Sequence, residues 1–266
     1  MNVVIRVKDL VVKLKSEPIL KKVNMEISGK CILLGPNGSG KTTLIKTILG
    51  MLNIDDGDVE IDGKSIKEIS RALGYVSTNL IDAYTLIPTN LRNTFLLYND
   101  LLNVDLSLAN EMLEMFSMSK DVLKKNIWEL STGQRKIVTL ILALSSKCRH
   151  ILLDEPFEDV DPARKKKIID LLKTINSNVL LSIHETWLLN IFKDWNCYIM
   201  ISGKAYGPVK IADLLEARIV RGSHERSILT ITIGDSTISI VKDVDEGIPI
   251  SQISTLDRIF EVVYYY

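Results

Sequence analysis

The sequence contains few of the residues that mark a disulfide-stapled, fibrous or strongly charged protein. Its three cysteines, Cys31, Cys148 and Cys197, are odd in number and widely spaced with no CxxC pair, so neither a disulfide framework nor a zinc site is indicated. Fourteen glycines and seven prolines are too few for a disordered or collagen-like chain. Because 33 basic residues balance 33 acidic ones, no overall charge draws the protein to nucleic acid or anionic lipid. We expect a folded cytosolic protein with reduced thiols.

Long hydrophobic runs are also missing. The first ten residues include Arg6, Lys8 and Asp9, which interrupt the apolar region that a signal peptide needs. The longest apolar runs, such as residues 137–144, are far shorter than the roughly 18 residues that cross a bilayer. We therefore expect a chain that is neither secreted nor membrane-spanning by itself.

The residues that are present describe a globular chain. Hydrophobic residues make up 46% and charged residues 25% of 266 positions, enough for one large domain or two modest ones. Alternating apolar residues between positions 2 and 27 predict antiparallel strands joined through residues 16–18. The apolar run at 31–34 predicts a buried strand that stops at Gly35, and a helix is expected at 42–51.

The middle of the chain has a helical pattern, and alternation of strands and helices follows. Apolar residues recur at three- and four-residue spacing over residues 86–130, which predicts a helical insert. Short strands are expected at 151–153, 179–183 and 198–201, with helices after the first two. Such alternation predicts a mainly parallel sheet.

The end of the chain has a different texture. Two alternating runs around Gly234 predict a hairpin at residues 228–241, and Ser254 is expected to cap a final helix. We therefore predict a main domain at residues 1–207, with its helical insert at about 86–135, and a small accessory domain at 208–266.

A glycine-rich loop follows the buried strand and precedes the first helix. Its pattern, G-x-x-x-x-G-K-[ST], lets backbone amides wrap the phosphates of a nucleotide, since the glycines put no Cβ atom in the way. Lys41 would add a positive charge and Thr42 a hydroxyl for Mg²⁺. A structural glycine turn is the alternative, but the strand before the loop and the helix after it favour a nucleotide site. The loop consists of Gly35, Pro36, Asn37, Gly38, Ser39, Gly40, Lys41 and Thr42.

Two carboxylates end another predicted strand. Asp154 and Glu155 follow the apolar residues 151–153, at the edge where an open α/β sheet presents its ligands. Asp154 would hold Mg²⁺ through water, and Glu155 would orient and polarise an attacking water. Adjacent acids can also be ordinary turn residues. Phosphoryl transfer needs both a glycine loop and such acids, so their presence together favours the catalytic interpretation.

Residues 130–134 indicate the subclass. Their sequence, Leu-Ser-Thr-Gly-Gln, resembles the LSGGQ signature of ATP-binding cassette (ABC) ATPases, with Thr132 in place of the first glycine. The glycine loop, this segment, the two carboxylates and His184 also occur in the order typical of that family, and the resemblance covers about residues 1–204. It implies an α/β fold: a P-loop NTPase core with a mainly parallel sheet, an N-terminal antiparallel β subdomain and an inserted α-helical subdomain. The predicted accessory domain adds a small α+β C-terminal extension.

The resemblance implies roles for residues after the predicted strands. Glu155 matches the catalytic base, and Asp161 matches the aspartate of the loop that follows it. His184 matches a histidine that contacts the γ-phosphate, although a histidine after residues 181–183 would by itself more often be an ordinary strand-end residue.

The resemblance also implies a dimer. Ser131 and the Gly133 amide would act on the γ-phosphate held by the glycine loop of a second nucleotide-binding domain, with Gln134 beside them. Thr43 would join the glycine loop around the nucleotide. Two ATP molecules with Mg²⁺ are then sandwiched between two such domains, and a monomer should hydrolyse ATP poorly.

Two positions depart from the family pattern. Leu14 stands where an aromatic residue usually stacks on adenine, so we expect apolar packing only and loose discrimination between ATP and other nucleoside triphosphates. Thr78 stands where a glutamine usually contacts the metal and the attacking water. Our hypothesis is that Thr78, or the adjacent amide of Asn79, substitutes for it through a shorter reach.

The function best supported by these features is the ATP-binding and ATP-hydrolysing subunit of an ABC transporter. We expect it to be peripheral on the cytoplasmic face of the cell membrane, with a separate transmembrane permease, a second nucleotide-binding domain as homo- or heterodimer, and no nucleic acid. Residues 253–261 resemble the ending of subunits from export-type systems, and an amphipathic covering helix is the alternative.

Two other functions remain open. A soluble ABC ATPase acting on nucleic acid is one, although the chain has one cassette, no sustained heptads and no metal cluster. An impaired ATPase that serves as a regulatory heterodimer partner is the other, and intact Lys41, Asp154, Glu155 and His184 argue against it.

Overall fold

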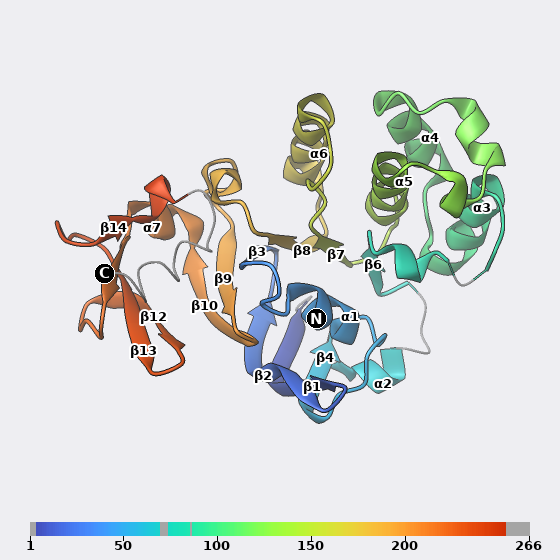
Figure 1. Cartoon of the computed structure of the whole chain (residues 1–266). Helices are drawn as coiled ribbons and strands as arrows, with labels where there is room; N and C mark the ends of the chain where they lie inside the picture. Colours follow the sequence, from blue (N-terminus) through green and yellow to red (C-terminus); the bar gives the residue numbers. More distant parts are fainter. Residues whose placement is uncertain (1–3, 70–73, 86, 254–266) are drawn as a thin grey trace. The chain divides into compact units, whose positions relative to one another are not determined.

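The computed structural model describes residues 4–69, 74–85 and 87–253 (Figure 1). Its internal contacts divide the chain into two units. Of the described residues, those from 67 to 181 form unit 1, and residues 4–66 and 182–253 form unit 2. Because the predicted boundary between residues 207 and 208 falls inside unit 2, the division into a main and an accessory domain stays a prediction.

Unit 2 begins with a four-stranded antiparallel sheet in the order β2-β1-β4-β5. Leu14 pairs with Glu17, so the hairpin turn is made by Lys15 and Ser16, both at positive φ. This turn starts one residue before the predicted one, and the predicted antiparallel N-terminal subdomain is confirmed. The strands are β1 (Ile5–Leu14), β2 (Glu17–Ile27), β4 (Asp56–Ile61) and β5 (Lys64–Ser65).

The next strands of unit 2 flank the glycine loop. Strand β3 (Lys30–Leu34) pairs in parallel with β9 (Asn196–Ile201), and β9 forms an antiparallel hairpin with β10 (Lys204–Lys210), a strand the sequence did not indicate. Helix α1 (Lys41–Ile48) ends three residues before the predicted position. Gly50, at φ +72°, donates its N–H to the Thr47 carbonyl at 2.9 Å and ends the helix in a left-handed turn.

A second antiparallel sheet of unit 2 has the order β12-β13-β11-β14. The hairpin predicted at residues 228–241 is confirmed, with Gly234 in its turn at φ +59°. The predicted final helix, from Ser254 onward, lies outside the described residues. The elements are α7 (Ile211–Glu216), β11 (Arg218–Arg221), β12 (Ser227–Ile233), β13 (Ser236–Val241), β14 (Ile248–Pro249) and the 3₁₀ turn η5 (Ile250–Gln252).

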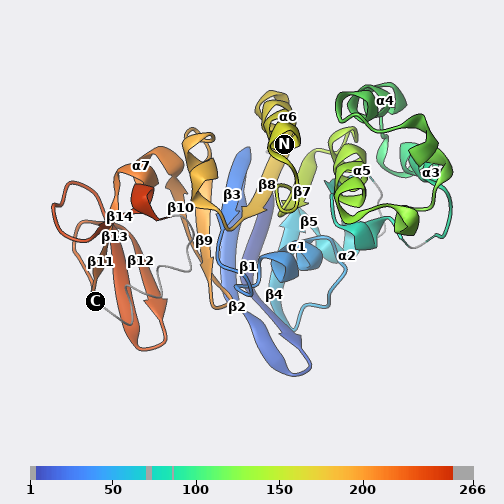
Figure 2. The ribbon, with the colours of Figure 1, turned by 45° about the horizontal axis from the view of Figure 1, so that its top comes forward.

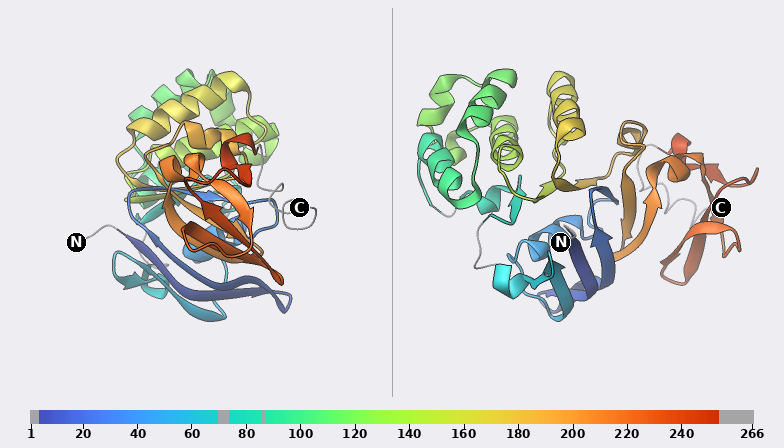
Figure 3. Two further views of the ribbon diagram at one scale, coloured as in Figure 1. Left: turned by 90° about the vertical axis from the view of Figure 1, so that its left-hand side faces the viewer. Right: turned by 180° about the vertical axis from the view of Figure 1, so that it is seen from behind.

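Unit 1 contains the helical insert. Helices α3, α4 and α5 lie side by side in Figures 2 and 3, and Phe116, the residue that follows α4, is fully buried. The helical pattern is confirmed, but α5 continues well past residue 135, the predicted end of the insert. The elements are α2 (Ile66–Ile69), the turn η1 (Ile81–Ala83), α3 (Leu91–Leu102), α4 (Leu106–Met115), the turns η2 (Lys120–Lys124) and η3 (Ile127–Glu129), and α5 (Thr132–Leu144).

The other elements of unit 1 carry the predicted carboxylates. Strand β6 (Val76–Thr78) pairs in parallel with β7 (His150–Asp154), which neighbours β8 (Asn178–Ile183), whose last two residues belong to unit 2. Helix α6 (Pro162–Thr174) is found where the sequence predicted it. The predicted mainly parallel arrangement is confirmed by the β3–β9 and β6–β7 pairs.

The helix predicted after β8 is wrong. Only the 3₁₀ turn η4 (Thr186–Asn190) follows. No side chain caps its start, because the Glu185 carboxylate accepts instead from Trp187 Nε1 at 2.6 Å. The Thr186 hydroxyl donates to the carbonyl of the distant Ile253, so the polar side chains at this turn form bonds other than a helix cap. No helix in the described part of the chain is long and apolar enough to span a membrane.

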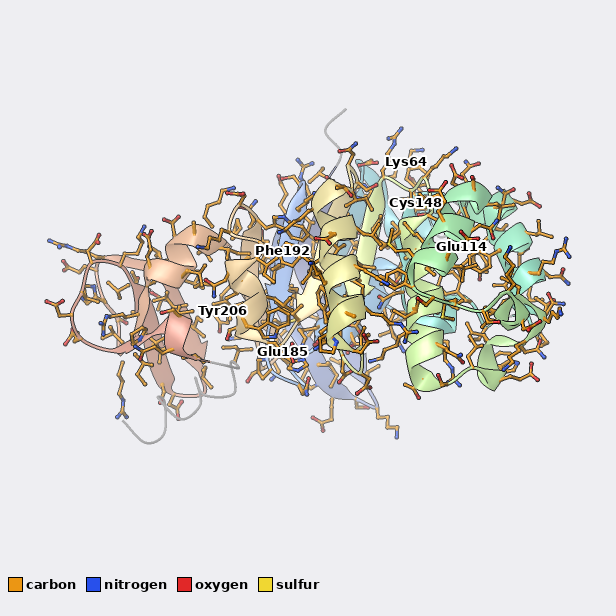
Figure 4. The ribbon with its side chains drawn as sticks, turned by 90° about the horizontal axis from the view of Figure 1, so that it is seen from above. Lys64, Glu114, Cys148, Glu185, Phe192 and Tyr206 are labelled. Carbon is orange, nitrogen blue, oxygen red and sulfur yellow. The ribbon has the colours of Figure 1, made fainter. Side chains whose placement is uncertain are left out.

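The three cysteines give a test of the packing. All three are free and at most 1% exposed; Cys148 is labelled in Figure 4. Burial raises the pKa of the Cys31 thiol to about 12, and it raises the pKa values of Cys148 and Cys197 as well. Since the thiolate is the reactive form, we expect no labelling of the native protein by a thiol reagent at pH 8 and full labelling in denaturant. Rapid native labelling of any one thiol would contradict this packing.

Candidate functional site

The glycine loop lies in unit 2 between β3 and α1, and two of its positions require glycine for different reasons. A Cβ atom on Gly35 would lie 2.4 Å from the Met200 carbonyl oxygen, and one on Gly40 would lie 2.9 Å from Met200 Cε. Gly40 also has φ +106°, a conformation that other residues rarely adopt. Glycine is therefore needed at Gly35 because of the nearby backbone and at Gly40 because of its backbone conformation, before any ligand is considered.

Lys41 and Ser39 are buried polar side chains of this loop. Lys41 is 5% exposed, and its Nζ donates to the carbonyls of Gly35 at 2.7 Å and Pro36 at 3.0 Å. Ser39 is 4% exposed, and among the described residues its Oγ has no hydrogen-bond partner. Leaving such a group unsatisfied costs about 1–3 kcal/mol. A phosphate oxygen would accept from Ser39 and attract the Lys41 ammonium, so the loop fits the phosphates of ATP.

The N-terminus of α1 completes this cradle. An α-helix has no internal acceptors for its first N–H groups, so α1 presents donors and the positive end of its dipole at the loop. Asn37, Gly38 and Thr42 are exposed, while Thr43 is half-buried. An exposed Thr42 hydroxyl on the first turn is the type of oxygen ligand that Mg²⁺ takes.

Two further predicted residues lie in unit 2. The Gly35 N–H donates to the Ile183 carbonyl at 3.1 Å, so the half-buried His184, as the next residue, stands beside the start of the loop. Leu14 ends β1 and is 40% exposed, which leaves apolar surface at the hairpin end. The roles of both residues toward the nucleotide stay predictions.

The predicted carboxylates lie together at one strand end of unit 1. Asp154 is the last residue of β7, and Glu155 follows it; both are half-buried. Glu155 has φ +43°, in the left-handed region that is uncommon for residues other than glycine. Backbone strain of this kind costs on the order of 1–3 kcal/mol and is found mostly at functional sites. The conformation agrees with a functional role for Glu155, but residues of an ordinary turn such as Lys15 and Ser16 also have positive φ, so the catalytic role stays a prediction.

Thr78 stands where the family usually has a glutamine, and Asn79 follows it. The side chains of these two residues have different surroundings. Thr78 ends β6 and is 3% exposed, and its hydroxyl accepts from the Leu80 N–H at 3.2 Å. The Asn79 side chain bonds the backbone of Asp154 at 2.7 and 2.9 Å. The predicted contact of Thr78 with a metal stays a prediction.

The signature segment begins α5 with a reciprocal cap. Ser131 Oγ accepts from the Gln134 N–H at 3.3 Å, and Gln134 Oε1 accepts from the Ser131 N–H at 3.2 Å. The hydroxyl proton of Ser131 takes no part in these bonds and is available to a phosphate. A Cβ atom on Gly133 would be 3.8 Å from the Asp159 carbonyl, an ordinary contact. No atom of the described structure therefore requires glycine there, which agrees with a role toward a ligand.

Asp161 has a clear structural task. It is the N-cap of α6, where its Oδ1 accepts from the Arg164 N–H at 3.0 Å, and Pro162 occupies the first helical turn. Its predicted contribution to nucleotide binding is not part of this cap and stays a prediction.

A family model described as "ABC transporter" matches residues 20–158, just over half of the chain. This chain belongs to the ABC transporter family. It is accordingly an ABC ATPase, the class that the signature segment predicted.

Relatives of this ABC ATPase serve several transport systems. The manganese transport system ATP-binding protein MntB of Bacillus subtilis is 32% identical over 73% of this chain and 82% of its own length. The zinc transport system ATP-binding protein TroB of Treponema pallidum is also 32% identical, over 68% and 71% respectively. A crystal structure described as a cobalt transport ATP-binding protein (cbiO-2) is 34% identical, covers 97% of this chain and 100% of its own, and has a TM-score of 0.89.

Sequence reasoning named Gln134 and Asn79 but did not give the hydrogen bonds that they make. The cap made by Gln134 could have been found, since S-x-x-Q is the pattern of a capping box. The partners of Asn79 depend on the register between two strands far apart in the sequence, which no local pattern shows. Lys136 was missed for the same reason: it bonds Glu158 Oε2 at 2.9 Å and Asp159 Oδ2 at 3.5 Å in the loop after the carboxylates.

The metal that the family implies would take oxygen ligands, which suit Mg²⁺ and leave it several waters. Thr42 of unit 2 carries a hydroxyl and Asp154 of unit 1 carries a carboxylate, and the role of each toward a metal stays a prediction. Within the described ranges no group of three or more His, Cys, Asp and Glu side chains is close enough to hold a metal ion.

The cap of α5 generates a prediction about Ser131. Ser131→Ala should lower the free energy of unfolding by about 1 kcal/mol through loss of the cap. It should also lower ATPase turnover well below that of a control variant with a similar loss of stability, because the phosphate no longer has the Ser131 hydroxyl as a hydrogen-bond donor. Urea unfolding and steady-state turnover measure the two effects. Ser119→Ala is the matched control, since Ser119 Oγ caps η2 by accepting from the Asp121 N–H. Equal turnover in both variants would exclude a phosphate role for Ser131.

Proposed function

We propose that this ABC ATPase is the subunit that hydrolyses ATP for a transport system and powers a separate transmembrane permease. Relatives named as ATP-binding proteins of manganese, zinc and cobalt transport support a transport role. Because these three are named for divalent metal ions, such an ion is the first substrate to test. On this proposal the protein is peripheral on the cytoplasmic face of the membrane.

The chain's own residues supply the chemistry of hydrolysis. The glycine loop and Lys41 hold the β- and γ-phosphates, and Ser39 donates its unsatisfied hydroxyl to them. Glu155 accepts a proton from the water that attacks the γ-phosphorus, and His184 contacts the γ-phosphate. When bound through Thr42 and Asp154, Mg²⁺ neutralises charge on the phosphates.

The exposed N-terminus of α5 is the observation that carries the dimer part of the proposal. Ser131 and Thr132 are exposed, and the cap leaves the Ser131 proton free. A helix N-terminus with an available hydroxyl is a site for an anion. We infer that this anion is the γ-phosphate of ATP held by the glycine loop of a second nucleotide-binding domain.

The dimer can be trapped by removing the base. Glu155→Gln should nearly abolish turnover while ATP still binds, so ATP and Mg²⁺ should convert the monomer into a dimer seen by size-exclusion chromatography with light scattering. Glu158→Gln is the matched control, because Glu158 lies in the same loop and pairs with Lys136. That variant should hydrolyse ATP and not accumulate as a dimer. A Glu155→Gln protein that stays monomeric with saturating ATP would refute ATP-driven dimerisation.

The permease and its cargo are tested in membranes. Co-expression with the membrane protein encoded nearest to this chain should yield a complex, and vesicles containing it should take up Mn²⁺, Zn²⁺ or Co²⁺ only with ATP. Lys41→Ala should abolish uptake without preventing assembly, since it removes the phosphate-binding charge. Lys22→Ala, at an exposed position on β2, should behave as wild type. Salt-sensitive retention on RNA or DNA, with no membrane association, would favour the nucleic-acid alternative instead.

A further inference from the structure

Strand β7 extends two residues past the end of its parallel neighbour β6. The parallel register pairs Thr78 with Leu152, and β6 stops there while β7 continues to Asp154. Where a strand extends past the end of its neighbour, the N–H and C=O groups on that side can bond a side chain in place of a strand backbone. Asp154, the predicted metal-binding carboxylate, is in this position.

The Asn79 side chain bonds both the backbone N–H and the backbone C=O of Asp154. Its Oδ1 accepts from the Asp154 N–H at 2.7 Å, and its Nδ2 donates to the Asp154 carbonyl at 2.9 Å. One primary amide thus replaces the donor and the acceptor of an absent strand residue. The two bonds hold the peptide groups on both sides of the Asp154 Cα atom, and so the direction in which its carboxylate leaves the strand.

The segment that carries Asn79 is itself held at two points. The Thr78 hydroxyl accepts from the Leu80 N–H at 3.2 Å and turns the chain, and the Thr78 carbonyl accepts from the Tyr84 hydroxyl at 2.5 Å. Tyr84 is 3% exposed and stacks edge-on against Tyr98 of α3, with ring centroids 4.7 Å apart. Burial raises the pKa of Tyr84, so its phenol keeps the proton it donates. Asn79 therefore extends from a rigid support.

The bonds from Asn79 also affect Glu155, the predicted catalytic base, because it directly follows Asp154. Glu155 has a left-handed backbone, φ +43°, which persists only where neighbouring groups over-determine it. The Asp154 carbonyl that Asn79 holds belongs to the peptide group joining Asp154 to Glu155. Releasing that peptide lets Glu155 relax toward an ordinary conformation and moves its carboxylate.

We propose that Asn79 is a positioning residue for ATP hydrolysis, which fixes the backbone of Asp154 and through it both carboxylates. This differs from the substitution hypothesis for Asn79, because the amide acts on the protein backbone and not on metal or water. The proposal rests on the proposed function in one respect, the roles of Asp154 and Glu155. Groups that orient metal ligands in this indirect way typically contribute 10–100-fold to activity or metal affinity.

The hydrogen bonds are tested first, without nucleotide. Amide hydrogen exchange at Asp154 should be faster in Asn79→Ala and in Asn79→Leu, which keeps the side-chain volume but neither bond. Asn79→Asp keeps the acceptor and should preserve protection of that amide. Asn99→Ala is the matched control: Asn99, in the same unit, donates to the Val104 carbonyl at 2.8 Å, and its loss should not change exchange at Asp154. Unchanged exchange in both Asn79→Ala and Asn79→Leu would overturn the proposal.

Kinetics then separate positioning from simple stability. Asn79→Ala and Asn79→Leu should each lower kcat about 10–100-fold and raise the Mg²⁺ concentration for half-maximal rate, with KM for ATP changed by less than about threefold. Asn99→Ala should keep wild-type kcat. A kcat within twofold of wild type in the Asn79 variants, or an equal loss in Asn99→Ala, would overturn the proposal. Wild-type protein without ATPase activity would instead refute the proposed function, and the exchange experiment would still decide whether Asn79 holds Asp154.

Discussion

A phosphate-binding loop must be held in shape while it keeps amide groups available for the phosphates, and the rest of unit 2 depends on how this is achieved. Much of the loop is held here through its carbonyl oxygens and through the absence of side chains at its glycines. The Gly35 and Pro36 carbonyls accept from Lys41, and the Ser39 carbonyl accepts from the Gly203 N–H at 3.0 Å. The absence of Cβ atoms at the loop glycines lets β9 approach within contact distance. The loop is thereby shaped before any nucleotide arrives, which reduces the ordering cost of binding.

Sequence patterns predicted elements whose signals are local. The hairpin at β12 and β13 follows from alternation around Gly234, and α6 begins at Pro162, where the sequence predicted a helix. The predicted roles of most site residues came from the family resemblance, because the spacing of residues along the chain does not by itself assign a role. Elements were mispredicted where distant contacts decide them. The turn after β8 is tied to Ile253 instead of continuing as a helix, and β10 depends on pairing with β9. Asn79 belongs with these, because its partners come from a strand 75 positions away.

The site residues of unit 1 share a physical pattern. Ser131 and Gln134 cap α5, Asp161 caps α6, and Asn79 completes the end of β7. Each satisfies backbone groups where a helix or strand ends, and strand and helix ends are where an α/β protein binds its ligands. A substitution at such a position removes a structural bond and a functional group together. Variants of these residues are therefore informative only beside a control that loses the same kind of bond elsewhere.

Lys136 joins the signature helix to the loop that follows Glu155. Its Nζ bonds the Glu158 carbonyl at 3.0 Å and pairs with the Glu158 and Asp159 carboxylates, and these side chains are partly open to solvent. On the proposed dimer, the loop lies next to one cassette's catalytic base while the helix contacts the ATP of the other. Loss of the γ-phosphate at one nucleotide would then be thermodynamically linked to affinity at the other. Because the link runs through screened ion pairs, cooperativity between the two nucleotides would weaken as ionic strength rises.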